Sequence, residues 1–80
     1  NFRHFRSENG KIILGRNESE NTQLENLNKK LNYNIIIPEK IPGPTALYEN
    51  SKDKKLTEEL IKVYSSKDLE LRKKFEKIKI

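Results

Sequence analysis

Hydrophobic and polar positions alternate with period two at the start of the chain, in two short runs separated by a turn signal. Successive side chains of a strand point to opposite faces. The first run therefore puts Phe2, His4 and Arg6 on one face and Arg3, Phe5 and Ser7 on the other. Asn9-Gly10 favours a tight type I′ turn. The pattern predicts a β-hairpin whose second strand is Lys11 to Leu14.

Two later segments have the spacing of amphipathic helices. Leu24, Leu27 and Leu31 recur at intervals of three and four residues, which gives one apolar stripe. Asn17, followed three residues later by Glu20, is a variant capping box that starts this helix. A second helix is predicted to begin between residues 53 and 57. Its apolar face holds Leu56, Leu60, Val63 and Tyr64, with Ile61 beside them.

Prolines divide the segment between the two predicted helices. Ile35 to Ile37 is a β-branched run bounded by Pro38, a pattern typical of a strand buried on both faces. Ile41-Pro42-Gly43-Pro44 predicts a rigid corner, because proline fixes φ and glycine frees it. Thr45 to Tyr48 is the strand that leaves this corner, and residues 50–55 form a polar loop.

The last residues allow two interpretations. They could continue a helix, or Phe75 to Ile80 could form a strand; we favour a break at Ser65-Ser66 and a terminal strand. The predicted fold class is α+β, a small mixed sheet with an N-terminal β-hairpin and two helices in the order ββαββα, with or without that strand. Without a repeat or a linker, residues 1–80 form one domain. The first residue is Asn1, so we expect a domain excised from a longer chain.

Composition narrows the class of protein. Of the 80 residues, 32% are hydrophobic and 36% are charged, which places the chain near the polar limit of what folds alone. Cysteine is absent, so neither a disulfide framework nor a thiolate zinc site can form. No apolar run approaches the length of a membrane span, and no signal-peptide pattern occurs. We expect a cytoplasmic domain without membrane contact.

The net charge of +5 is concentrated at the two ends of the chain, because acids outnumber bases in residues 18–50. Two basic ends that meet in the fold would attract phosphate groups. The alternative is that the lysines of the C-terminal third are ordinary solvated charge, in a chain rich in Asn, Lys and Ile. Lysine content alone therefore does not decide the function.

Catalytic and metal chemistry find little support. His4 is the single histidine and no cysteine accompanies it, so we expect no metal and no cofactor. Ser7 falls on the opposite face of its strand from His4, which argues against a nucleophile and base pair. The three glycines are too scattered for a phosphate-binding loop. An enzyme would need its site at the Pro42 to Thr45 corner, and we expect none.

The residue types support RNA binding better than they support catalysis or metal binding. Basic side chains interleave with rings at Arg3, His4, Phe5 and Arg6, and guanidinium groups pair with phosphate while rings stack on unpaired bases. Phe5 could instead fill the core of a half-buried sheet. Arg16, at the turn into the first helix, could either cap backbone carbonyls or reach a phosphate.

The first third of the chain resembles a known family. Arg3-His4-Phe5-Arg6-Ser7, Asn9-Gly10, residues 12–17 and Asn21 are similar to the opening of the RNA-binding domain of the NFACT ribosome quality-control factors, many of which are also labelled fibronectin-binding proteins. The proline-glycine corner and Leu56 to Ser66 extend the resemblance. The family's histidines around the corner and its basic, glycine-containing tail are missing here.

The resemblance implies a non-catalytic domain that binds tRNA or the RNA of the large ribosomal subunit, together with the rest of its parent protein. The residues that we predict to contact RNA are Arg3, His4, Phe5, Arg6, Arg16, Asn17 and Asn21. The alternative function is a protein-interaction, scaffolding or fibronectin-binding adhesin domain without an RNA role. The two differ in whether a partner protein is recovered after nuclease treatment.

Overall fold

The residues that the structure describes fold around one four-stranded antiparallel sheet. The computed structural model describes residues 2–38 and 43–65. Its elements, in chain order, are β1 (Arg3–Ser7), β2 (Gly10–Leu14), α1 (Glu18–Leu31), β3 (Asn34–Ile36), β4 (Ala46–Tyr48), the 3-10 turn η1 (Ser51–Asp53) and α2 (Lys54–Ser65). This order confirms the predicted α+β class. The first half of the predicted corner and the predicted terminal strand lie outside the described residues.

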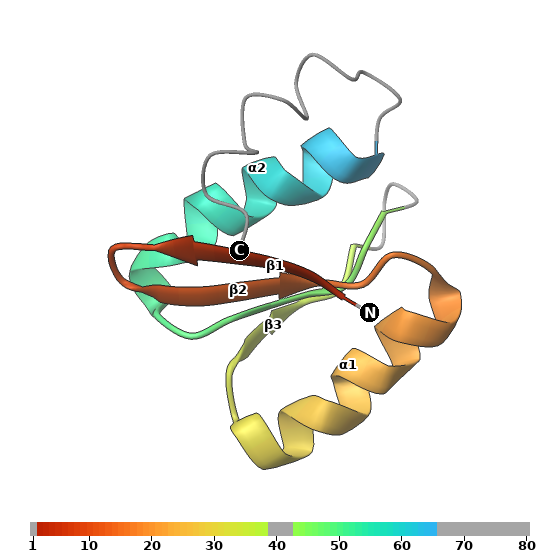
Figure 1. Cartoon of the computed structure of the whole chain (residues 1–80). Coiled ribbons are helices and arrows are strands. Elements are labelled where there is room, and N and C mark those ends of the chain that lie inside the picture. The colour runs from red at the N-terminus through yellow and green to blue at the C-terminus, as the bar shows by residue number, and fades with distance from the viewer. Residues whose placement is uncertain (1, 39–42, 66–80) are drawn as a thin grey trace.

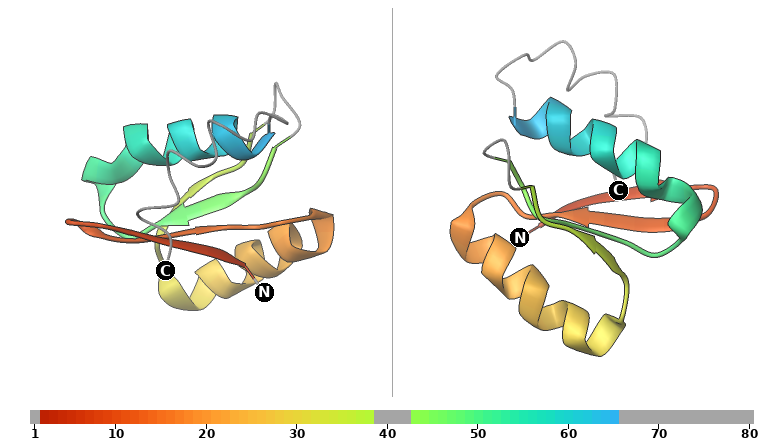
Figure 2. Two further views of the ribbon diagram at one scale, coloured as in Figure 1. Left: turned by 45° about the horizontal axis from the view of Figure 1, so that its top comes forward. Right: turned by 180° about the vertical axis from the view of Figure 1, so that it is seen from behind.

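The two helices cover opposite faces of the sheet, so the domain has three layers (Figure 1). On the α2 side, Phe5 and Ile12 pack with Leu60 in the larger apolar cluster. On the α1 side, Ile13 packs with Leu24 in the smaller one. The two views of Figure 2 show the sheet between the helices. Because neighbouring residues of β2 point to different helices, a strand of five residues contributes to both clusters.

The strand order is β1-β2-β4-β3, which makes β2 and β4 the central strands. All three residues of β4 are buried. The prediction that Ile35 to Ile37 is buried on both faces is wrong, because β3 lies at the edge of the sheet. Ile35 is 38% exposed and Ile37, which follows the strand, is 48% exposed.

The predicted hairpin is confirmed, with a different turn. β1 and β2 pair from Arg3 opposite Leu14 to Ser7 opposite Gly10, so Glu8 and Asn9 are the turn residues. The prediction of a type I′ turn at Asn9-Gly10 is wrong. Gly10 has a φ of +151°, whereas Asn9 has no positive φ. A side chain at Gly10 would also meet the carboxylate of Glu49.

Both predicted helices are present. In α1, Leu24 is fully buried and the stripe emerges into solvent at Leu31, which is 36% exposed. The predicted polar loop at 50–55 is shorter than expected, since η1 and the start of α2 occupy most of it. Asp53 anchors this start to the hairpin, because its carboxylate accepts hydrogen bonds from the Ser7 hydroxyl (2.5 Å) and the Asn9 amide (3.2 Å). Neither helix in the described ranges is long and apolar enough to cross a membrane.

Candidate nucleic-acid interface

The hairpin register places two arginines from distant positions at one end of the sheet. Arg3 begins β1, and its Cα partner is Leu14, the last residue of β2. The chain then continues through Gly15 to Arg16, which is exposed. Antiparallel pairing therefore brings the start of β1 beside the turn into α1, where both guanidinium groups lie at one cavity.

Backbone and side-chain hydrogen bonds hold this turn in place. The Gly15 N–H donates to the Thr45 carbonyl (3.0 Å), and the Thr45 N–H donates to Oδ1 of Asn21 (3.0 Å). Asn21 thus joins α1 to the residue that precedes β4. A Cβ at Gly15 would fall almost on Oδ1 of Asn21. Glycine is the residue that lets these three segments approach.

A capping box fixes the start of α1. Oδ1 of Asn17 accepts from the Glu20 N–H (2.9 Å), as predicted. The Glu20 carboxylate reaches one residue further back than in the usual box, and accepts from the Arg16 N–H (2.9 Å). Burial raises the pKa of Glu20, but the Arg16 N–H and the Arg16 charge are among the causes that outweigh it, so this pKa lies below its ordinary value.

The end of α2 supplies an aromatic surface beside the arginines. Tyr64 packs against Phe5 with ring centroids 5.6 Å apart. The Arg3 guanidinium lies 4.5 Å from the centroid of the Tyr64 ring, a cation–π contact. The C-terminal end of a helix carries partial negative charge, which favours a guanidinium there. The side chain of Arg3 is therefore held over Tyr64.

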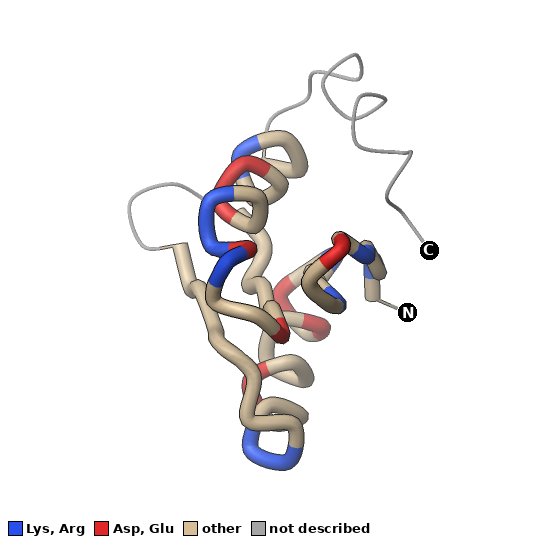
Figure 3. Tube along the Cα trace, turned by 90° about the vertical axis from the view of Figure 1, so that its left-hand side faces the viewer, with Lys and Arg blue, Asp and Glu red and all other residues tan. Residues whose placement is uncertain are grey.

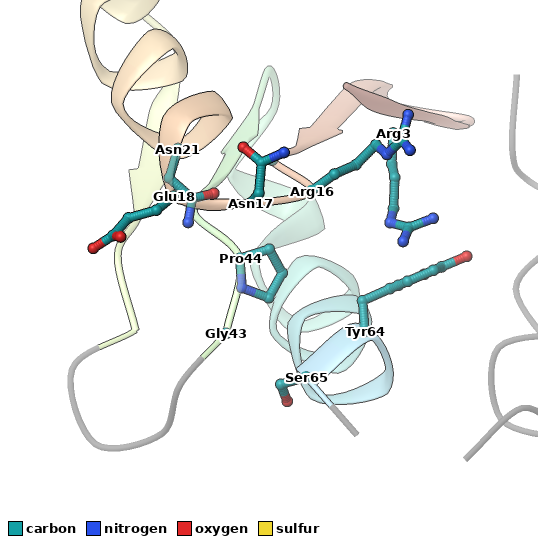
Figure 4. A pocket seen from close by; sticks show the side chains of 10 residues that line it. Arg3, Arg16, Asn17, Glu18, Asn21, Gly43, Pro44, Tyr64 and Ser65 are labelled. Carbon is teal, nitrogen blue, oxygen red and sulfur yellow. The ribbon is translucent and has the colours of Figure 1, made fainter. Parts of the chain in front are cut away.

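We call the resulting cavity the arginine groove. It has a volume of about 400 Å³ and is lined by Arg3, Gly15, Arg16, Asn17, Glu18, Asn21, Gly43, Pro44, Tyr64 and Ser65. Figure 4 shows the side chains of Arg3 and Arg16 extending to the same side of the groove, near the Tyr64 ring. Glu18 is the one acidic residue among these ten, so the lining carries net positive charge.

The groove combines the groups that recognise a nucleotide. Guanidinium forks pair with phosphate oxygens, and the guanidinium plane of Arg3, held over the Tyr64 ring, is a surface on which an unpaired base can stack. Asn17 and Asn21 use their amide oxygens within the protein, so their NH2 groups can donate to a ligand. Within residues 2–38 and 43–65, no group of three or more His, Cys, Asp and Glu side chains is arranged to hold a metal ion.

The structure divides the predicted RNA contacts into three sets. Arg3, Arg16, Asn17 and Asn21 meet at the arginine groove. His4 and Arg6 lie on the opposite face of β1, at a second cavity of about 330 Å³. The prediction that Phe5 contacts RNA is wrong, because its side chain is 0% exposed and fills the core. The alternative interpretation of Phe5 as a core residue is confirmed.

Sequence reasoning missed the contribution of α2 to the groove. Tyr64 and Ser65 were assigned only to a helix face and a helix end. The sequence signal for this contact was weak, since the residues around a tyrosine in the last turn of a helix do not show whether it packs against another element.

Positive charge outside the groove is spread over both helices and the hairpin (Figure 3). The groove is therefore defined by its shape and its pairing of ring and guanidinium, more than by charge density.

A small α+β domain with a groove of arginine, amide and tyrosine side chains is a binding module suited to an anionic partner with planar groups. The model of the family described as the NFACT protein RNA binding domain matches residues 3–77, nearly the whole chain. The chain belongs to this RNA-binding family. No curated protein and no solved structure matches it.

Proposed function

We propose that this domain is a non-catalytic RNA-binding module that contacts tRNA or the RNA of the large ribosomal subunit. It would act in the cytoplasm as one part of a ribosome-associated quality-control factor. Membership of the RNA-binding family supports the class of ligand. The observation that carries the proposal at the residue level is that Arg16 lines the same groove as Arg3, whose guanidinium lies over the Tyr64 ring.

The geometry favours a phosphate at the two guanidinium groups. Like charges that share one cavity repel each other, and an anion between them relieves that repulsion while accepting several hydrogen bonds. The cation–π contact holds Arg3 in place before binding, which lowers the entropic cost of ordering its side chain. Arg16 is positioned by the Gly15 and Glu20 hydrogen bonds of its own turn.

The remaining lining suits the sugar and base of the same nucleotide. The groove volume of about 400 Å³ lies at the small end of the range for ligand pockets. Asn17 and Asn21 present amide donors, and Ser65 lies at its rim. An RNA loop or end, whose bases are unpaired, can place one nucleotide there. A regular duplex offers its phosphates but no free base.

The test is RNA binding by the Arg3→Ala/Arg16→Ala variant. Each lost charge-assisted contact is expected to cost about 1.5 kcal/mol, so affinity for tRNA or large-subunit RNA should fall about tenfold for each arginine that contacts it. Filter binding or fluorescence anisotropy at fixed salt measures the loss. Removal of Arg3 also ends the Tyr64 contact, so thermal unfolding of the variant is recorded alongside.

The matched control is Lys29→Ala/Lys30→Ala, which removes the same charge. These lysines are exposed in the last turn of α1, about 18 Å along the helix from Asn17. This control is expected to retain affinity within about twofold. An arginine variant that folds and binds like the control would overturn the assignment to the groove. Absence of RNA binding by the unaltered chain would overturn the proposed function itself.

A further inference from the structure

The face of the hairpin opposite the arginine groove carries a second group of basic and aromatic side chains. Arg6 and Lys11 are Cα partners across β1 and β2, so their side chains share one face. His4 lies on that face two residues before Arg6, and Phe2 two residues earlier still. We call Phe2, His4, Arg6 and Lys11 the hairpin patch.

Placing Arg6 opposite Lys11 does not stabilise the folded domain. Like charges directly opposite each other in an antiparallel pair are destabilising. Arg6 and Lys11 are both exposed. Glu49 is close to Lys11, because its carboxylate accepts the Lys11 backbone N–H (3.0 Å). An anionic ligand would relieve the repulsion between the two cations.

The patch also presents rings. The Phe2 and His4 rings lie 6.4 Å apart, edge to face at 61°. His4 is exposed, whereas Phe2 is half-buried and packs at the margin of the α1 cluster. An unpaired base can stack on such a surface, because every base has a flat face. The His4 ring borders the cavity of about 330 Å³, which is lined by His4, Phe5, Arg6 and Lys11.

The helices leave this region uncovered. α1 packs on the inner part of the sheet through Leu24, against Ile13 and Leu47. The turn end of the β1–β2 hairpin projects beyond α1 in Figure 1 and again in the left view of Figure 2. Among the strands of residues 2–38 and 43–65, β1 lies at an edge of the sheet, and a ligand that passes around this edge reaches both faces.

We propose that the hairpin patch is a second contact surface for single-stranded RNA, distinct from the arginine groove and on the opposite face of β1. A base stacks on Phe2 and His4, and the adjoining phosphate lies between Arg6 and Lys11. A single strand that crosses the β1 edge engages both surfaces, which raises its affinity by linkage. This inference rests on the proposed RNA-binding function and specifies its ligand as unpaired nucleotides.

The test uses an oligouridylate of about twelve nucleotides, a length within the usual range for single-strand sites. We expect Arg6→Ala/Lys11→Ala to lower its affinity about tenfold. The matched control is Lys54→Ala/Lys55→Ala, an equal charge change at exposed positions at the start of α2. It is expected to stay within about twofold of the unaltered chain.

A second measurement reports on the patch directly. His4 is the single histidine, so its ring protons give one set of NMR signals. They should shift when the oligouridylate binds and stay in place when an RNA duplex is added, because a duplex offers no free base. Phe2→Leu keeps an apolar side chain for the α1 cluster and should weaken the oligouridylate about fivefold.

The outcomes separate this inference from the proposed function. If the unaltered chain binds the oligouridylate but His4 does not shift, or if Arg6→Ala/Lys11→Ala matches its control, the patch is not a contact and the groove stands alone. Equal His4 shifts with duplex would overturn the single-strand assignment. If the chain binds no RNA, both proposals fail. His4 shifts that persist in Arg3→Ala/Arg16→Ala would establish the patch as an independent surface.

Discussion

Asn21 is the residue on which the geometry of the arginine groove depends most. Its amide oxygen accepts the Thr45 N–H, and its backbone and side chain fill the space beside Gly15. The family resemblance identified Asn21 as an RNA contact. The structure adds a second role for this groove residue, because its amide oxygen binds the Thr45 N–H and so holds α1 against the residue before β4.

We expect Gly15→Ala to lower the free energy of unfolding by about 1–3 kcal/mol, as overpacking a tight site does. The added Cβ would meet Oδ1 of Asn21 and lie 3.0 Å from its backbone nitrogen. Urea unfolding measures the loss. In an Asn21→Ala background the same change should cost at least about 1 kcal/mol less, because one clash is gone. Equal costs in both backgrounds would show that Asn21 is not what excludes a side chain.

Glu20 makes the start of α1 sensitive to acid. Its folded pKa is lowered, so its charged form adds stability above the ordinary glutamate pKa of about 4.3. That contribution is lost as the pH falls through the lowered pKa. Glu20→Gln keeps an oxygen for the Arg16 N–H but has no charge to titrate.

We expect the difference in Tm between the unaltered chain and Glu20→Gln to be largest near neutral pH and to shrink below about pH 4. Glu25→Gln, at an exposed position on the same helix, is the control. Its difference in Tm should change less over the same range. A Glu20→Gln difference that stayed constant with pH would show that the carboxylate charge does not stabilise this turn.

At the scale of elements, strand order decides which apolar residues are buried. Ile35 to Ile37 had the stronger local pattern, yet β3 lies at the edge and β4, which has the same length, lies in the centre. Periodicity identifies a strand but does not say which strands will flank it. Which strand becomes central depends on pairings between segments more than thirty residues apart, such as Ile12 with Tyr48.

Two substitutions that delete the same number of carbon atoms test the difference in burial between the central strand β4 and the edge strand β3. Leu47→Ala should lower the free energy of unfolding by about 2–5 kcal/mol, because Leu47 is 0% exposed in a central strand. Ile35→Ala, opposite it on β3, should cost about 1 kcal/mol or less. Similar costs in urea unfolding would contradict the assignment of β3 to the edge.

Local signals predicted other elements well. The hairpin and the cap of α1 depend on contacts between residues close in sequence, such as Asn17 with Glu20. The predicted type I′ turn was wrong because other hydrogen bonds shape this turn. The Ser7 hydroxyl accepts the Asn9 N–H (3.0 Å) and also donates to Asp53. The second of these bonds comes from a distant segment, and a dipeptide signal such as Asn9-Gly10 does not include it.

At the scale of the whole molecule, the hairpin presents arginines to two separate surfaces. Sequence reasoning identified Arg3, Arg6 and Arg16 individually, but it treated them as one site. Alternation along β1 sends Arg3 to the α2 face and Arg6 to the other. That alternation was visible in the sequence; the position of α2 beside Arg3 was not, because it depends on packing of α2 across the sheet.

The central claim is that Arg3 and Arg16 bind RNA phosphate in the arginine groove, and the salt dependence of tRNA binding tests it most directly. Each phosphate neutralised contributes about 0.7 to 0.9 to the slope of log K against log salt. The slope of Arg3→Ala/Arg16→Ala should therefore be shallower than that of the unaltered chain by about 1.5. A variant that folds and keeps the original slope would contradict the claim.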